Sequence, residues 1–366
     1  MFMNMKVRPI AMYLPQFHPI QENNEWWGKG FTEWTNVAKA KPRFWGHYQP
    51  HLPADLGFYD LRVPEVREQQ AAMAKEAGIY GFCYYHYWFN GKRLLERPVN
   101  EILDSGKPDF PFMLCWANEN WTRIWDGGNK EILMEQNYSE EDDREHIQYL
   151  LNSVFNDPRY IKVDNKPVFC IYNSYMFPNM KRTLSIWREE AKKVGMELYL
   201  CRMERQLNEG KECFDGFDAA IEFQPFASLY YNYKNKRTIS FLIKDVRGRL
   251  QRKGIFSFII SYKKYVENVS KHPLKWDYKK YPGITPGWDN SARRKKAFIA
   301  MHGSTPALYG MWMSNIVKKF IPYSKEENFI FINAWNEWAE GNHLEPDKKW
   351  GTQYLAETKK ALQNGK

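Results

Sequence analysis

Short apolar runs recur along this 366-residue chain, and the segments between them are long enough to hold a helix or an extended loop. Such runs are typical of strands in a parallel sheet that is buried on both faces. Eight units of this kind predict a closed (β/α)8 TIM barrel, an α/β fold. The expected strands are Pro9–Leu14, Ile79–Tyr85, Phe112–Trp116, Val168–Tyr172, Leu198–Cys201, Ala219–Phe223, Ile284–Trp288 and Phe329–Ile332.

An open, doubly wound sheet is the alternative arrangement of the same elements. It is disfavoured because no glycine-rich phosphate loop follows the first run, where a dinucleotide-binding fold needs one. Amphipathic helices are expected between several strands, at Val63–Ala77, Ser139–Phe155 and Lys181–Val194. No linker or internal repeat divides the chain, so residues 1–366 are expected to form one catalytic domain.

Three long segments follow the first, third and sixth expected strands: Gln16–Asp60, Asn118–Glu135 and a basic insertion at about residues 229–281. Loops at these strand ends build the active sites of TIM barrels, so elaborated βα loops are expected to surround a ligand. The insertion holds 14 Lys or Arg and three acidic residues, a local charge of +11 in a chain whose net charge is +10. Residues 234–280 could thus contact an anionic membrane or a lipid-linked glycan, or form a solvated insertion.

Cysteine content, the N-terminal sequence and the placement of acidic residues indicate the cellular compartment and the class of partner. Four of the five cysteines lie in apolar runs and no Cys-x-x-Cys is present, which predicts buried free thiols in a reducing compartment. No apolar signal-peptide core precedes the first strand, so a cytoplasmic protein is expected, with peripheral contact at the inner membrane. Acidic groups at the strand ends argue against a nucleic-acid partner.

Polar and aromatic side chains follow nearly every expected strand, and such groups bind polyols. Convergence of eight such ends is hard to explain by core packing and predicts a ligand site. The candidate binding residues at the strand ends are Tyr13, Gln16, His18, His86, Tyr87, Trp88, Asn118, Glu119, Tyr172, Arg202, Glu222, Trp288, Asp289, Asn290, Asn333 and Asn336.

Two similar clusters, Trp116–Trp121 and Ala334–Trp338, supply candidate carboxylates beside tryptophan, whose ring faces stack on sugars. Glu119 and Glu337 could act as acid/base and nucleophile of a glycosidase, depending on their separation. Glu337 and Glu340 are the preferred pair, because both follow the last strand and must share a pocket. Like charges in one pocket split their pKa values, which suits one carboxyl for acid and the other for base chemistry.

Other chemistries lack their motifs. The chain has no His-Glu-x-x-His, Gly-x-Ser-x-Gly or Asp-x-Asp sequence. His18, His47, His51, His86 and His343 are scattered rather than paired at ligand spacing. The sequence therefore predicts an enzyme that needs no metal and no cofactor.

Several long, aromatic-rich motifs resemble those of the WbsX-type glycosyltransferases of lipopolysaccharide and capsule biosynthesis, which look related to the family 99 endo-α-mannosidases and mannanases. The resemblance covers nearly the whole chain. Its motifs are Tyr13–Pro19, Trp26–Trp34, Tyr84–Phe89, Trp116–Trp121, Pro286–Asn290 and Asn333–Gly341. It adds Trp26, Trp27, Glu33, Trp34, Trp121, Trp335, Trp338 and His343 to the expected substrate-binding residues.

The family 99 hydrolases are (β/α)8 barrels with a Glu-Trp-x-Glu-Gly motif, to which Glu337–Gly341 is similar. The resemblance implies that Glu337 takes the proton of the sugar 2-hydroxyl and that Glu340 is the general acid/base of a retaining reaction through a 1,2-anhydro sugar. The expected substrate is an α-linked bacterial surface polysaccharide or its precursor. A glycosyltransferase that assembles O-antigen or capsule is the alternative, and a non-catalytic glycan-binding barrel is a third.

Overall fold

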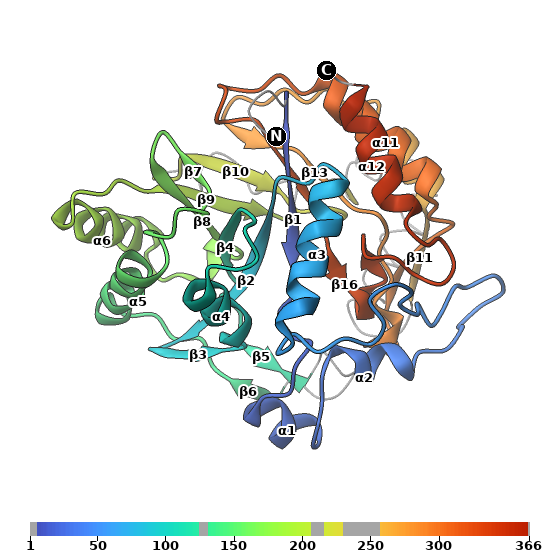
Figure 1. Cartoon of the computed structure of the whole chain (residues 1–366), viewed down its shortest axis with the longest axis horizontal. Helices are drawn as coiled ribbons and strands as arrows, with labels where there is room; N and C mark the ends of the chain where they lie inside the picture. The colour runs from blue at the N-terminus through green and yellow to red at the C-terminus, as the bar shows by residue number, and fades with distance from the viewer. Residues whose placement is uncertain (1–5, 124–130, 206–215, 230–256, 365–366) are drawn as a thin grey trace, which may run out of the picture.

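The computed structural model describes residues 6–123, 131–205, 216–229 and 257–364. Its main sheet is parallel around the barrel, and the order of the strands in space follows their order in the chain (Figure 1). The barrel strands are β1 (Arg8–Tyr13), β2 (Gly81–Phe89), β4 (Phe112–Trp116), β8 (Lys166–Ile171), β9 (Tyr199–Glu204), β10 (Ala219–Glu222), β12 (Lys280–Tyr281), β13 (Gly283–Ile284) and β15 (Phe329–Ile332). The predicted (β/α)8 fold is confirmed.

The seventh strand of the barrel is broken into β12 and β13. Pro282 separates the two halves and lacks the N–H that a continuous ladder requires. Because β12 pairs with β10 and β13 pairs with β15, the two halves together close the barrel. The expected strand Ile284–Trp288 was therefore placed too late in the chain, since only Ile284 belongs to β13.

Gly283 lies where the closing strand crosses closest to its neighbour. A Cβ atom built on Gly283 would run into the backbone carbonyl of Glu222. Gly283→Ala is expected to lower the free energy of unfolding by about 1–3 kcal/mol, because backbone must move to admit the methyl group. Urea denaturation measures the loss. An unchanged midpoint would show that the seventh strand has more room than the structure gives it.

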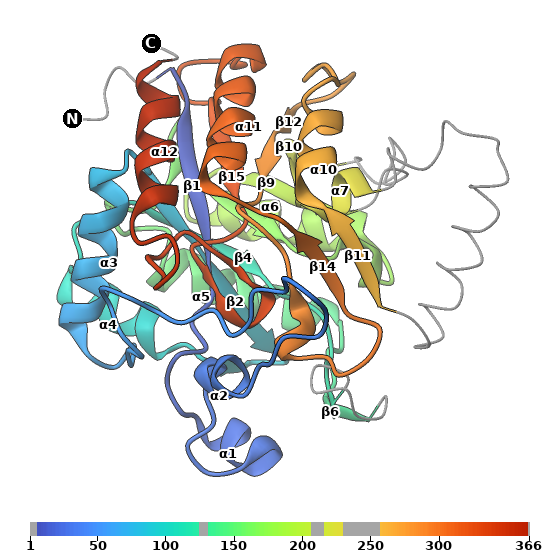
Figure 2. The same cartoon turned by 90° about the vertical axis from the view of Figure 1, so that its right-hand side faces the viewer.

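Helices pack around the barrel, and the three predicted helices are confirmed within a few residues as α3, α5 and α6. In Figure 2, α3, α12 and α11 stand side by side along the outside of the barrel. The helices are α1 (Gln21–Trp27), α2 (Glu33–Ala38), α3 (Pro64–Glu76), α4 (Arg97–Ser105), α5 (Glu140–Ser153), α6 (Met180–Lys193), α7 (Phe226–Leu229), α10 (Tyr262–Val269), α11 (Pro306–Lys319) and α12 (Gln353–Gln363).

The long loops gather at one end of the molecule. Figures 1 and 2 place α1, α2 and β6 at that end, while the start of β1 and the end of α12 lie at the opposite end. The additional strands are β3 (Lys92–Leu94), β5 (Trp121–Thr122), β6 (Ile132–Met134), β7 (Lys162–Val163), β11 (Phe258–Ser261), β14 (Ile299–His302), β16 (Asn336–Glu337) and β17 (Asn342–His343). The predicted insertions after the first and third strands, Gln16–Asp60 and Asn118–Glu135, thus lie at the carboxyl ends of the barrel strands.

The basic insertion is described only in part. Residues 230–256, which carry much of its positive charge, lie outside the described residues. Its remainder forms β11, which pairs with β14, and α10, and its last two residues form the barrel strand β12. The four cysteines in apolar runs are buried free thiols, as predicted, and Cys213 lies outside the described residues.

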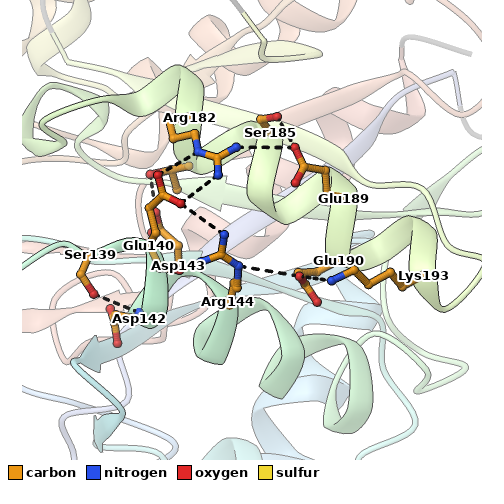
Figure 3. A network of polar contacts seen from close by, with 11 residues as sticks. Ser139, Glu140, Asp142, Asp143, Arg144, Arg182, Ser185, Glu189, Glu190 and Lys193 are labelled. Carbon is orange, nitrogen blue, oxygen red and sulfur yellow. Dashed lines mark hydrogen bonds and ion pairs between the residues drawn. The ribbon is translucent and has the colours of Figure 1, made fainter.

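An ion-pair network joins α5 to α6 on the outside of the barrel (Figure 3). The Glu140 carboxylate accepts hydrogen bonds from Arg182 Nε (2.9 Å) and Nη2 (2.8 Å) and from Arg144 Nη2 (3.2 Å). Glu190 binds Lys193 at 2.6 Å. The side chains of Glu140, Arg144 and Arg182 are exposed, and ion pairs between exposed side chains each contribute little to stability.

Candidate active site

The end of the last barrel strand leads into a tight hairpin that carries both candidate catalytic carboxylates. After β15, the chain forms β16, a single 3-10 turn at Trp338–Glu340, and β17, which pairs antiparallel with β16. Gly341 allows the reversal between them with a left-handed φ of 55°. Glu337 is 6% exposed, so the hairpin presents its carboxylate from a buried position.

Glu337 and Glu340 line one cleft of about 420 Å³ at the carboxyl ends of the barrel strands. Aromatic side chains form much of its wall, and arginine and glutamate side chains converge on it. That combination of ring faces and a few polar groups is typical of a carbohydrate site. The aromatic lining consists of Tyr85, Tyr87, Trp121, Tyr172, Phe223, Phe226 and Trp288.

Arg293 holds the two carboxylates together. Its Nη1 lies 2.8 Å from Glu340 Oε1, and its Nη2 lies 3.2 Å from Glu337 Oε2. Nη2 also lies 2.5 Å from Oε1 of Glu33, which enters from the start of α2. Arg293 itself is 7% exposed. One buried guanidinium therefore faces three carboxylates, and a full set of three negative charges would exceed its single positive charge.

This imbalance changes the proton affinity of the pair. Burial is the main cause that raises the pKa of Glu337 well above its ordinary value, and the nearby Glu340 raises it further. Burial also raises the pKa of Glu340. Arg293 opposes both shifts but does not cancel them. Two coupled carboxyls of this kind titrate as a pair and can share one proton, which is the state that acid/base chemistry needs.

Glu119, the alternative carboxylate, lies in the same cleft but in a different environment. Its Oε1 accepts hydrogen bonds from Arg205 Nη1 (2.8 Å) and Asn173 Nδ2 (2.7 Å). The Arg205 guanidinium also lies over the Tyr172 ring, 4.5 Å from its centre. Both donors bind Oε1, so Glu119 is held by partners other than Arg293, and this arrangement suits a role in positioning substrate.

The strand β2 divides its polar side chains between two layers. It continues to Phe89, beyond the predicted end, so residues 86–88 lie within the strand. Side chains of a strand alternate between its faces, and Tyr85 and Tyr87 line the cleft. His86 and Trp88 point outward, where His86 Nε2 lies 3.0 Å from His146 Nε2 and Trp88 donates to Asp142.

The predicted residues separate into groups by position. Besides the two catalytic candidates, those that line the cleft are Tyr87, Glu119, Trp121, Tyr172, Trp288 and Asn290. An adjoining cavity of about 170 Å³, which shares Trp121 and Arg293 with the cleft, adds Gln16, Trp26, Trp27 and Glu33. A third cavity, on the other side of Trp288, is lined by Asp289 and His343.

The other predicted residues do not line these three cavities, and several support the site from behind. Asn336 accepts from the backbone N–H of Leu14 (2.7 Å) and donates to its carbonyl (3.0 Å), which ties the hairpin of Glu337 and Glu340 to the residue that follows β1. The Asn118 side chain donates to the backbone carbonyl of Asn173 and accepts from its backbone N–H. The residues outside the cavities are Tyr13, His18, Trp34, His86, Trp88, Asn118, Arg202, Glu222, Asn333, Trp335, Asn336 and Trp338.

Sequence analysis missed six polar or aromatic residues of the cleft: Tyr85, Arg205, Phe223, Phe226, Arg293 and Arg294. A signal existed for the last two, because they directly follow Asp289–Ala292, next to a motif already selected. Two adjacent arginines after a candidate strand end are a reasonable partner for excess carboxylates. The contact of Arg293 with Glu337 and Glu340 depends on the closure of the barrel, which no local pattern reveals.

Glu345 forms a second buried carboxylate site directly beneath Trp338. It accepts hydrogen bonds from Gln70 Nε2 (2.6 Å), Tyr59 OH (2.9 Å) and Trp338 Nε1 (2.6 Å). Burial outweighs these donors and raises the pKa of Glu345 from 4.5 to about 7. The hydrogen bond to Glu345 fixes the orientation of the indole of Trp338, which directly follows Glu337 in the chain.

This raised pKa makes stability depend on pH. Because Glu345 binds its proton more tightly in the folded state, its contribution is complete below about pH 4.5 and is lost as pH rises through about 7. The glutamine in Glu345→Gln cannot ionise. The unfolding free energy of the variant should therefore fall by up to about 3 kcal/mol less than that of the wild type as pH rises. Urea unfolding at pH 4.5 and at pH 8 measures how much the unfolding free energy of each protein changes between the two pH values. Equal changes in the variant and the wild type would mean that Glu345 titrates normally in the folded protein.

Comparison of the sequence with known proteins identifies the family of this chain. Residues 9–358 match the family model described as Glycosyltransferase WbsX. The chain belongs to the WbsX family. The uncharacterized protein WxcX of Xanthomonas campestris pv. campestris is 41% identical over 360 residues, which cover 96% of this chain and 49% of WxcX. The chain therefore spans about half the length of the curated relatives that it matches.

Solved structures share the fold at low sequence identity. The GH99 endo-alpha-mannosidase from Bacteroides thetaiotaomicron aligns with a TM-score of 0.57 and 16% identity over 98% of this chain and 97% of its own. A glycoside hydrolase-like protein aligns with a TM-score of 0.60 and 16% identity over 98% and 95% of the two chains. The WbsX family and this barrel together support a carbohydrate-active enzyme.

In the part of the chain that the structure describes, no helix is both long enough and apolar enough to span a membrane.

Proposed function

We propose that this WbsX protein acts on an α-glycosidic bond of a bacterial surface polysaccharide or its precursor, through a retaining site formed by Glu337 and Glu340. The observation that carries the proposal is the binding of two carboxylates, the buried Glu337 and the half-buried Glu340, by one guanidinium inside an aromatic cleft. A non-catalytic binding site would gain nothing from two carboxyls that compete for a proton. The sharing of one proton between an acid and a base is what glycosidic bond cleavage requires.

In the proposed first step, the Glu337 carboxylate takes the proton of the sugar 2-hydroxyl. The 2-oxygen attacks the anomeric carbon, the bond to the leaving oxygen breaks, and Glu340 donates its proton to that oxygen. The product is a 1,2-anhydro sugar with inverted configuration. A raised pKa makes the Glu337 carboxylate a stronger base toward a sugar hydroxyl, which is a weak acid, but it also favours the protonated form of Glu337 before the sugar binds.

In the second step, Glu340 as a carboxylate takes a proton from water or from an acceptor hydroxyl. That oxygen attacks the anomeric carbon and opens the three-membered ring, and Glu337 returns its proton to the 2-oxygen. Two inversions give overall retention. The mechanism requires the shared proton to reside on Glu340 when the sugar 2-hydroxyl contacts Glu337.

The second candidate function is transfer from a nucleotide sugar, and the glycosyltransferase description of the matching family favours it. One screen separates the two functions. The purified protein is incubated with the surface polysaccharide of its host and, separately, with nucleotide sugars plus that polysaccharide. Oligosaccharide with new reducing ends supports the first proposal, and release of nucleoside diphosphate supports the second. If neither product forms, both proposed functions are wrong.

We also propose peripheral contact with anionic lipid or a lipid-linked glycan through residues 234–280, on the basis of their positive charge. Reversal of charge at Lys244, Arg247, Arg249, Arg252 and Lys253 to Glu should weaken binding to phosphatidylserine-containing vesicles by more than tenfold. A basic residue near such a surface contributes about 1 kcal/mol to binding, so the reversal of five charges should weaken binding by more than this tenfold change. Unchanged sedimentation with vesicles would contradict the proposal.

A further inference from the structure

A third cavity of about 320 Å³ lies on the far side of Trp288 from the catalytic cleft. Three residues that are distant in the sequence meet on its wall: His51 from the loop after α2, His343 from β17, and Asp347 from the segment before α12. His343 is 4% exposed and Asp347 is 2% exposed, while His51 is half-buried. The proposed glycosidase chemistry uses none of these side chains.

The donor atoms of the three residues converge. His51 Nδ1 lies 2.9 Å from His343 Nε2, and Asp347 Oδ2 lies 3.8 Å from the same nitrogen. All three donor atoms lie within 4.8 Å of one another. Ligand distances to zinc are about 2.0–2.2 Å, so donors on one ion are at most about 4 Å apart. A modest rotation of these side chains would bring all three donors within reach of one ion.

The surroundings hold two of the three side chains in the orientation that a ligand needs. His343 Nδ1 lies 3.0 Å from the carbonyl oxygen of Glu345, and a proton donated there leaves the lone pair of Nε2 free to bind. The His343 ring also stacks on Trp338, with ring centres 3.8 Å apart. The other oxygen of Asp347, Oδ1, accepts from the backbone N–H groups of Lys349 (2.9 Å) and Trp350 (2.6 Å), which directs Oδ2 toward the histidines.

We propose that His51, His343 and Asp347 bind a divalent transition-metal ion, with zinc as the probe of choice. Two imidazoles and one carboxylate form a donor set that zinc and iron(II) favour, and both metals accept water in the remaining positions. The adjoining cavity has room for that water. In register, His343 pairs with Asn336 across the hairpin that also carries Glu337. The ion would therefore fasten the catalytic hairpin to the loop after α2 and to the segment before α12.

The test uses the full chain after treatment with a chelator. Isothermal titration with ZnCl₂ should give one site of micromolar or tighter affinity, and a 100-fold excess over Kd should raise Tm by roughly 3–6 °C. Co²⁺ in place of Zn²⁺ should give visible absorption bands from a nitrogen- and oxygen-ligated ion. Asp347→Asn and His51→Asn should each weaken zinc binding at least tenfold. His302→Ala is the matched control, because His302 lines the same cavity outside the triad.

Two results would overturn the proposal. The first is no saturable zinc binding by the wild-type protein, which would identify the His51–His343 contact as a hydrogen bond between two imidazoles. The second is equal binding by the wild type and by folded Asp347→Asn and His51→Asn variants, which would place the ion elsewhere. Because His51 is half-buried, its variant keeps the test open if the Asp347 variant does not fold.

Discussion

Replacement of either Glu337 or Glu340 by glutamine is expected to lower kcat on the true substrate by about 1,000-fold, the typical contribution of a general acid or base. Glutamine keeps the shape of the side chain and one oxygen that can accept from Arg293. It cannot donate or accept the proton that the proposed reaction moves. Steady-state kinetics on the polysaccharide identified by the screen measures the loss.

The control for these variants is affinity for the glycan. Isothermal titration should give a Kd within about threefold of the wild type, because the aromatic walls of the cleft supply most of the contact area. Glu119→Gln tests the alternative carboxylate and should chiefly raise KM, since Glu119 is held by Arg205 and Asn173. A larger loss of kcat in Glu119→Gln than in Glu340→Gln would assign acid/base chemistry to Glu119.

Removal of the Arg293 guanidinium is expected to cost about 3–5 kcal/mol of unfolding free energy at pH 8, as for other broken buried ion pairs. Arg293→Met leaves Glu33, Glu337 and Glu340 with no counter-charge at their centre. Arg293 lowers the pKa of Glu337 and of Glu340, so without its charge both pKa values rise further, and protonation at low pH relieves the repulsion. The loss should therefore be smaller at pH 5 than at pH 8, which urea unfolding at the two pH values measures.

Two further variants make this test specific. Addition of Glu33→Gln to Arg293→Met should recover part of the lost stability, because one carboxyl of the uncompensated cluster is then absent. Arg144→Met, which removes an exposed partner of Glu140 on α5, should change stability by less than about 1 kcal/mol. An equal loss at pH 5 and pH 8 for Arg293→Met would indicate lost packing rather than lost charge.

The barrel was predictable because seven of its strands are continuous apolar runs, the pattern that burial on both faces demands. The seventh strand in order around the barrel was misplaced, since Lys280–Ile284 contains a lysine and a proline and no apolar run marks it. The Lys280 ammonium lies 2.9 Å from Glu204 Oε2, so a tertiary ion pair permits a buried charge that sequence patterns count against a strand.

The two glutamates of the hairpin were predictable from their spacing, whereas the charge that couples them was not. Arg293 meets Glu337 across 44 residues and Glu33 across 260 residues of chain. The inward positions on β2 were also misassigned at His86 and Trp88, because a strand that continues to Phe89 sends alternate side chains to opposite layers. Periodicity alone does not say where such a strand ends.

The central claim is that Glu337 and Glu340 form a retaining glycosidic site, and the anomeric configuration of the first product tests it most directly. Proton NMR recorded during digestion of the α-linked polysaccharide follows the new reducing end before mutarotation. The account predicts that the α anomer appears first and that the β anomer grows in later. Initial formation of the β anomer would contradict it, because a single inversion leaves no place for the 1,2-anhydro sugar.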